Sequence, residues 1–190
     1  MTLDIAYFPP VEYFSILAKY SSVYLDTSGN YQKQSYRNRC RILTANGPMD
    51  LRFPVIHDGE RKITGIRVDY STPWVRATEY AIESAYSSSP FFVYYKDELF
   101  SILDSNPVTL WELDYLIISF FCRRIGIPEP VVGVSEGIAS EKVEIHPKKP
   151  SSYIGREYWQ VFREKFGFVP DLSVMDLLFN EGPESLCYLK

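Results

Sequence analysis

Cysteine and histidine are scarce in this sequence, which has three cysteines and two histidines among 190 residues. Cys40, Cys122 and Cys187 are widely spaced, and none belongs to a Cys-x-x-Cys pair. This pattern excludes a disulfide framework and predicts reduced thiols. His57 and His146 lie far apart, with no carboxylate cluster at ligand spacing, so we predict no metal site built from protein side chains.

Long apolar runs are also missing. The longest, residues 115–122, lies between Asp114 and Arg123 and is too short to cross a bilayer. Residues 1–10 lack the basic start and the apolar stretch of a signal peptide. Together with the reduced thiols, these absences predict a cytoplasmic protein without membrane insertion.

Basic residues are fewer than acidic ones: the sequence has 20 basic and 24 acidic residues, which gives a formal net charge of -4. Nucleic-acid binding relies on broadly distributed positive charge, so we predict no nucleic-acid partner. A hydrophobic fraction of 46% indicates a packed globular protein, and the length fits one domain over residues 1–190. Homo-oligomerisation is left open by the sequence.

Acidic residues are absent between Asp26 and Asp50, and the middle of this gap is basic. Residues 30–42 read NYQKQSYRNRCRI. Arginine suits bidentate contact with phosphate or carboxylate, and the interleaved amides suit sugar hydroxyls. We interpret the stretch as a site for a small anionic substrate; the alternative is a basic solvated surface. The predicted substrate-binding residues are Asn30, Gln32, Lys33, Gln34, Tyr36, Arg37, Asn38 and Arg39.

A glycine-rich phosphate turn is missing from the first loop. Residues 3–8 read as a buried strand, 11–20 as an amphipathic helix and 22–26 as a second strand, which predicts a β-α-β start. The loop between the first strand and the helix is Tyr-Phe-Pro-Pro, which excludes a nicotinamide or flavin site. A nucleotide held by arginines stays open. We predict no cofactor other than a Mg²⁺ ion accompanying such a nucleotide near Asp26.

Turn and alternation signals predict an antiparallel extension. Asn46-Gly47 separates residues 40–44 from 49–55, and a further turn leads to a third strand over 62–69. If residues 36–42 are extended, Arg37, Arg39 and Arg41 share one face.

Helices are predicted over residues 72–85, 91–103 and 109–125, with Thr72 and Thr109 as caps and the last of these central and buried. Residues 130–134 read as a buried strand, and Ser173 caps a short helix that stops at Gly182. The expected fold class is therefore α/β: a three-layer, Rossmann-like mixed sheet with a β-α-β start, an antiparallel hairpin extension and a helical C-terminal segment.

Ligands of parallel sheets bind beyond the carboxyl ends of the strands, where Asp26 and the loop leading to Arg37 are expected. Glu12 and Asp26 are the candidate catalytic residues, either being a general base. A second basic region, Lys142, Lys148, Lys149 and Arg156, is a candidate to fold toward the first. Residues 133–137 match the Gly-x-Ser-x-Gly of a nucleophile elbow, but no helix pattern follows, so we interpret the match as chance.

The sequence resembles the WbqC-like family of small bacterial proteins, many encoded among genes for O-antigen and other surface polysaccharides. The matching segments are residues 7–14, 30–42, 46–47, 54–55, 81–86, 89–95 and 171–183, including Arg37-Asn38-Arg39 and the tail Leu177-Leu178-Phe179-Asn180-Glu181-Gly182-Pro183. The sequence departs from the family pattern at Tyr7-Phe8, where many relatives carry Gln-Pro, and at Thr78, where many carry a histidine.

The resemblance implies a transferase acting on a sugar nucleotide or phosphorylated sugar in surface-polysaccharide biosynthesis, with glycine or aminoacyl transfer as one form. The alternative is a non-catalytic module that binds a nucleotide sugar or a partner protein. An RNA-binding protein is a third reading, which predicts a steep salt dependence of binding.

Overall fold

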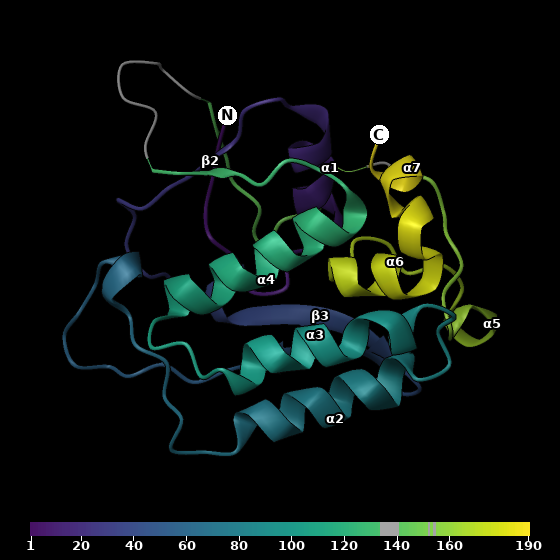
Figure 1. Ribbon diagram of the computed structural model, residues 1–190, viewed down its shortest axis with the longest axis horizontal. Coiled ribbons are helices and arrows are strands. Elements are labelled where there is room, and N and C mark those ends of the chain that lie inside the picture. The colour runs from purple at the N-terminus through teal and green to yellow at the C-terminus, as the bar shows by residue number, and fades with distance from the viewer. Residues whose placement is uncertain (134–140, 152, 154) are drawn as a thin grey trace.

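The structure is a computed structural model that describes residues 1–133, 141–151, 153 and 155–190 (Figure 1). Residues 134–140 lie outside the described residues. They include Ser135 of the Gly-x-Ser-x-Gly match at residues 133–137, which we interpreted as chance. Within the described part, a mixed α/β fold contains a parallel four-stranded sheet, an antiparallel hairpin and a helical C-terminal segment, which confirms the predicted fold class.

The chain opens with the predicted β-α-β unit. Strand β1 (Thr2–Leu3) is followed by helix α1 (Val11–Lys19) and strand β2 (Tyr24–Leu25), and the two strands pair in parallel. Both strands are shorter than predicted. Pro10 precedes α1, where a missing N–H suits the helix start.

Two late strands complete the parallel sheet. Strand β5 (Val131–Val132) pairs with β2, and strand β6 (Lys142–Val143) pairs with β1. The strand order is β5-β2-β1-β6. The prediction that residues 130–134 form a buried strand was wrong in one respect, because β5 is an edge strand whose two valines are about half exposed.

The hairpin forms a sheet of its own. Strands β3 (Arg39–Thr44) and β4 (Gly47–Arg52) pair antiparallel around a two-residue loop. Gly47 follows this loop with φ +106°, a conformation that glycine adopts without strain.

Two predictions for this region were wrong. Residues 36–38 are not extended but form a 3₁₀ turn, η1 (Tyr36–Asn38), so Arg37 leaves the face that Arg39 and Arg41 share. The third strand is replaced by the 3₁₀ turn η2 (Ile63–Gly65) and isolated bridges, of which one joins Val55 to Val68.

The middle of the chain is helical, and Figure 1 shows its three long helices side by side. They are α2 (Trp74–Tyr86), α3 (Phe92–Asp104) and α4 (Leu110–Ile125). Thr109 caps α4 as predicted: its hydroxyl accepts from Glu112 N at 3.1 Å, and Gly126 ends the helix in the left-handed region. Thr72 was wrongly predicted as a cap, because Pro73 holds the N-cap position of α2 without a side-chain hydrogen bond.

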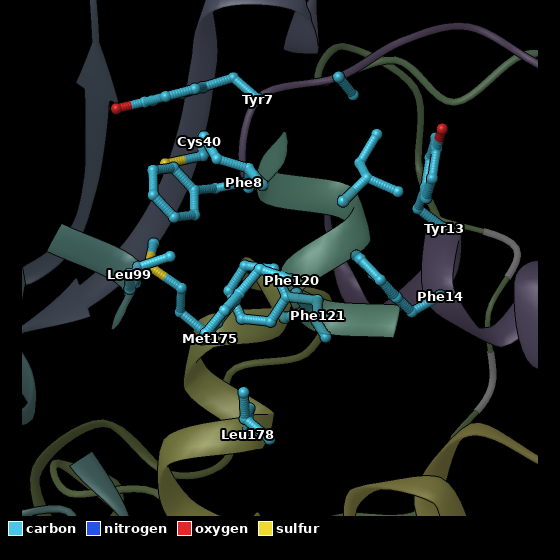
Figure 2. Packing of buried hydrophobic residues seen from close by; sticks show 14 of the residues in the cluster. Tyr7, Phe8, Tyr13, Phe14, Cys40, Leu99, Phe120, Phe121, Met175 and Leu178 are labelled. Atoms are coloured by element: carbon cyan, nitrogen blue, oxygen red, sulfur yellow. The ribbon is translucent and has the colours of Figure 1, made fainter. Parts of the chain in front are cut away.

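Helix α4 is the centre of the hydrophobic core, as predicted. Its buried residues include Phe120 and Phe121, and the ring of Phe121 lies 5.0–6.1 Å from those of Phe120, Phe14 and Phe8. Figure 2 shows Phe120 and Phe121 between the N-terminal aromatics and Met175. The start, the middle and the end of the chain therefore share one core.

The last residues fold as four short helical pieces. They are α5 (Arg163–Phe166), α6 (Val174–Glu181), η3 (Gly182–Glu184) and α7 (Ser185–Leu189). Ser173 caps α6 as predicted, accepting from Met175 N. Helices α6 and α7 pack on α1. Among the residues that the structure describes, no helix is long and apolar enough to span a membrane.

Candidate functional site

The order of the parallel strands defines where a ligand is expected. From β1 the chain moves to β2 on one side, and it later returns to the other side of β1 as β6. The direction of winding thus reverses between β1 and β6. Open α/β sheets bind ligands beyond the carboxyl ends of their strands at such a reversal.

A pocket lies at this position, and we call it the edge pocket. One side is lined by residues 3–6, which run from the last residue of β1 into the segment after it. Another side is lined by residues 143–146, which do the same at β6, and Gln32, Ser35, Tyr36 and Arg37 of the basic stretch contribute a third. The cavity measures about 20 Å³, which is room for roughly one water molecule. A sugar or nucleotide would therefore have to bind at its mouth or widen it.

Two cations and two carboxylates alternate in a row of ion pairs beside the edge pocket. Arg37 Nη2 lies 3.1 Å from Asp4 Oδ2, Lys142 Nζ lies 2.9 Å from Asp4 Oδ1, and the same Nζ lies 2.8 Å from Asp26 Oδ2. Arg37 is 5% exposed, so this guanidinium is buried and needs its partners. The two cations and two carboxylates balance one another.

Asp26 is held as a carboxylate. Its Oδ1 accepts hydrogen bonds from Ser28 N at 2.8 Å and from Ser28 Oγ at 2.6 Å. Burial works to raise the pKa of Asp26, but the contacts with Lys142 and Ser28 outweigh it and lower the pKa to about 2. A carboxylate with so low a pKa is a weak proton acceptor. In this arrangement Asp26 is therefore suited to orienting Lys142 and poorly suited to acting as a general base.

The loop before η1 is fixed by local hydrogen bonds. Ser35 Oγ donates to Gln32 O at 2.6 Å and accepts from Arg37 N at 3.3 Å, which starts η1. Tyr36 O accepts from Tyr7 N at 2.8 Å, tying η1 to the segment after β1. Arg37 Nη1 then donates to Gln32 Oε1 at 2.9 Å. Burial raises the pKa of Tyr36 to about 12, so its hydroxyl stays protonated.

His146 also lines the edge pocket. Its Nδ1 accepts from Lys148 N at 3.2 Å, which places the proton of the neutral imidazole on Nε2. In this tautomer His146 offers a hydrogen-bond donor at Nε2. The second basic region folds toward the first only in part. Lys148 Nζ donates to Gln34 Oε1, and Lys142 shares Asp4 with Arg37, whereas Lys149 pairs with Glu144 and Arg156 lines the separate cavity beside α1.

A second pocket lies on the hairpin side of the same loop, and we call it the arginine pocket. Its lining residues are Tyr31, Gln34, Asn38, Arg39 and Arg52, and its volume is about 180 Å³. Asn38 Nδ2 donates to Phe53 O at 2.9 Å, and Arg39 Nη2 donates to Gln34 O at 2.6 Å. Together these bonds set the shape of the pocket wall.

The predicted site residues divide into three groups. Gln32, Tyr36 and Arg37 line the edge pocket, with Asp26 joined to them through Lys142 and Asp4. Gln34, Asn38 and Arg39 line the arginine pocket. Asn30 and Lys33 are exposed in the loop between β2 and η1 and line neither pocket.

Glu12 stands apart from both pockets. It lies in the first turn of α1, where its backbone N–H donates to Asp171 Oδ1 at 2.9 Å. Glu12 lines a separate cavity with Lys19 on the other side of α1. The structure thus does not bring the two candidate catalytic residues together.

Sequence reasoning missed several lining residues. Asp4 follows β1 and lines the edge pocket, and no local pattern reveals its pairing with Lys142 of β6. The signal for Arg52 was present, since alternation along residues 49–55 placed it on the polar face. Within the described ranges, no group of three or more His, Cys, Asp or Glu side chains is placed to hold a metal ion.

Comparisons with known proteins place the chain in a family. The WbqC-like protein family matches residues 6–149, a range that contains Arg37, Lys142 and the lining of the arginine pocket. A protein of Mycobacterium tuberculosis (strain ATCC 25618 / H37Rv), named "Uncharacterized protein Rv1507c", is 27% identical over 221 residues, covering 97% of this chain and 94% of that protein. No solved structure gives a significant match. Because the matched range is well over half of its length, the chain belongs to the WbqC-like protein family.

Proposed function

We propose that this protein is a cytoplasmic transferase acting on a sugar nucleotide or a phosphorylated sugar in bacterial surface-polysaccharide biosynthesis, with glycine or aminoacyl transfer as one form. The observation that carries the proposal is the edge pocket. It lies where the winding of the parallel sheet reverses, and Arg37 of the basic stretch lines it.

The proposed roles follow the positions of the side chains. Arg37, Arg39 and Lys33 attract the anionic substrate, and Gln34 and Asn38 orient it. The candidate catalytic residues are Asp26 and Glu12. Asp26, with its lowered pKa, would act by holding Lys142 toward the substrate, and the role of general base would fall to Glu12, which requires the substrate to reach the first turn of α1; a Mg²⁺ ion accompanying a nucleotide would be near Asp26. Tyr36 and His146 offer hydrogen-bond donors at the pocket wall.

A non-catalytic binding module is the second candidate, and one observation favours it. Each carboxylate near the edge pocket is held by a cation: Asp4 by Arg37 and Lys142, Asp26 by Lys142, and Glu144 by Lys149. A general base works best with a pKa near the working pH, and Asp26 and Glu144 have lowered pKa values. A protein that only binds its ligand has no need of such a base.

The first test is a thermal-shift screen against nucleotides, sugar nucleotides and sugar phosphates. A ligand at about a hundred times its dissociation constant adds roughly 2.7 kcal/mol to the free energy of unfolding, which moves the midpoint by several degrees. We expect one ligand class to give this shift and Arg37→Ala to abolish it. Because Arg37→Ala also breaks the ion pair with Asp4, the ligand-induced shift is compared with each variant's own ligand-free midpoint.

Arg67→Ala is the matched control, because Arg67 is exposed and pairs with Asp58 away from both pockets. It should keep the full ligand-induced shift. If no ligand of these classes moves the midpoint, the proposed function is wrong.

Turnover separates the two candidates. Asp26→Asn should lower the rate of an enzyme while keeping ligand affinity, whereas a binding module has no rate to lose. A ligand that binds through Arg37 without any product forming in the presence of candidate acceptors would favour the binding module.

A further inference from the structure

The hairpin carries an excess of positive charge beside the arginine pocket. Asp50 Oδ1 lies 3.0 Å from Arg41 Nε, and Asp50 Oδ2 lies 3.5 Å from Arg39 Nη1 and 3.4 Å from Arg52 Nη2. In the described part of the chain, Asp50 is the one acid within ion-pair distance of these three arginines. One carboxylate against three guanidinium groups leaves two positive charges without a counterpart.

The register of the hairpin concentrates this charge. Arg39 and Arg52 are directly opposite each other across β3 and β4, an arrangement in which like charges repel. Both line the arginine pocket, and none of its lining residues is acidic. An anion between the two guanidinium groups would relieve the repulsion.

The two arginines of the pocket also hold hydrogen-bond donors that are not fully used. Arg39 Nε is buried and has no hydrogen-bond partner among the described residues, although Arg39 Nη1 and Nη2 are engaged. Arg52 is 63% exposed along its side chain, so most of its donors are free to turn to a ligand. Tyr31, half-buried in the wall, adds a ring and a hydroxyl.

The size of the pocket limits what it holds. A cavity of about 180 Å³ is well below the several hundred Å³ of sites that enclose a whole drug-sized ligand. It has room for a phosphate group, with the remainder of the molecule outside.

We propose that the arginine pocket is a phosphate subsite, in which Arg39 and Arg52 bind a group carrying two negative charges. Such a group is either the phosphate of a sugar phosphate or the diphosphate of a sugar nucleotide. This deepens the proposed function and rests on it for the identity of the substrate. It places the phosphate at Arg39 and Arg52. Arg37, which is held by Asp4 and Gln32, would contact another part of the same substrate at the edge pocket.

The hairpin supplies a matched pair of variants. Arg52→Ala removes a lining residue, whereas Arg41→Ala removes an equal charge that pairs with the same Asp50 but does not line the pocket. The side chains of Arg41 and Arg52 are 46% and 63% exposed, so both variants should fold. Calorimetric titration with inorganic phosphate, glucose 1-phosphate and UDP-glucose measures the dissociation constants.

We expect at least one probe to bind, and Arg52→Ala to weaken its binding about tenfold or more while Arg41→Ala changes it less than about threefold. Of glucose 1-phosphate and UDP-glucose, the probe with the lower dissociation constant shows whether the subsite prefers the phosphate of a sugar phosphate or the diphosphate of a sugar nucleotide. Equal losses in the two variants would overturn the proposal, because they would indicate general surface charge. Binding of none of the three probes would also overturn it.

The result is distinguishable from failure of the proposed function. If UDP-glucose binds and Arg37→Ala abolishes its binding but Arg52→Ala does not, the phosphate subsite is wrong and the proposed function stands. If phosphate binds through Arg52 but no sugar nucleotide or sugar phosphate is turned over, the subsite stands and the transferase is wrong.

Discussion

Asp176 is a carboxyl group in the protein interior, in the first turn of α6. It is 2% exposed, and its Oδ2 accepts a hydrogen bond from Gln160 Nε2 at 2.7 Å. Burial raises the pKa of Asp176 to about 6, although the hydrogen bond from Gln160 works in the opposite direction. Gln160 in turn binds both the N–H and the carbonyl of Val169, so this one polar group organises the chain before α6.

The raised pKa predicts a pH dependence of stability. Between about pH 4 and pH 6 the folded protein binds a proton that the unfolded chain releases, so stability from Asp176 falls as the pH rises through this window. Asp176→Asn removes the titration. We expect the wild type to lose about 2 kcal/mol relative to this variant between pH 4.5 and pH 7.5 in urea unfolding.

Glu164→Gln, an exposed position on α5, is the control and should track the wild type at both pH values. A constant difference between the wild type and Asp176→Asn across the pH range would contradict the raised pKa.

The arginines show what residue patterns can predict. The sequence identified a basic stretch, and the structure does place Arg37 and Arg39 at pockets. It did not predict that Asp4 neutralises Arg37, because that pairing joins residues on different elements. The pairing of Arg41 with Asp50 could have been predicted, because the hairpin turn and the alternation of both strands place these two residues opposite each other.

At the scale of elements, capping gives a direct comparison of two threonines. Both Thr72 and Thr109 precede helices, but only Thr109 accepts a hydrogen bond from its helix. We expect Thr109→Ala to lower the free energy of unfolding by about 1 kcal/mol, and Thr72→Ala to change it by less than about 0.5 kcal/mol. Chemical denaturation of the two variants beside the wild type measures both values. Equal losses of unfolding free energy in the two variants would show that the hydrogen bond of Thr109 does not stabilise α4.

Elements with strong local signals were predicted well. Helix α4 has a cap, a buried apolar surface and a glycine stop, and its predicted bounds agree with the structure to within one residue. The hairpin followed from its turn and alternation. The bend at η1 was missed because it depends on a bond from Arg37 N to Ser35 Oγ and on one from Tyr7 N to Tyr36 O, and the second is a contact between distant segments.

At the scale of the whole molecule, the candidate site depends on contacts between segments that lie far apart in the sequence. Strand β6 comes from the last third of the sequence and pairs beside β1 at the start. Parallel pairing of two-residue strands leaves little local pattern, so β6 could not be predicted. The sequence placed Lys142 in a basic region expected to fold toward residues 30–42, but it could not show that Lys142 contacts Asp4 and Asp26. The edge pocket exists only where these distant segments lie together.

Lys142 is the residue that joins the segments electrostatically, because it contacts both Asp4 and Asp26. Lys142→Ala would leave Asp26 with Ser28 alone, and we expect it to lower the free energy of unfolding. Since Lys142 is nearly half exposed, solvent screening limits the loss to about 1 kcal/mol. Lys149→Ala is the matched control: its pair with Glu144 is more than half exposed on both sides and should contribute less.

A double-mutant cycle of Lys142→Ala with Asp26→Asn tests whether this contact is the cause. If it is, the double variant loses less than the sum of the single losses, because the ion pair can be removed only once. The sign of the pH dependence follows from the lowered pKa of Asp26: the stabilisation is complete above about pH 4 and is lost as the pH falls toward 2. The coupling energy should therefore be larger at pH 7 than at pH 3. Additive losses at pH 7 would mean that the Lys142–Asp26 contact does not stabilise the fold, and that its role lies in the site, with Asp4 as the remaining ionic partner of Lys142.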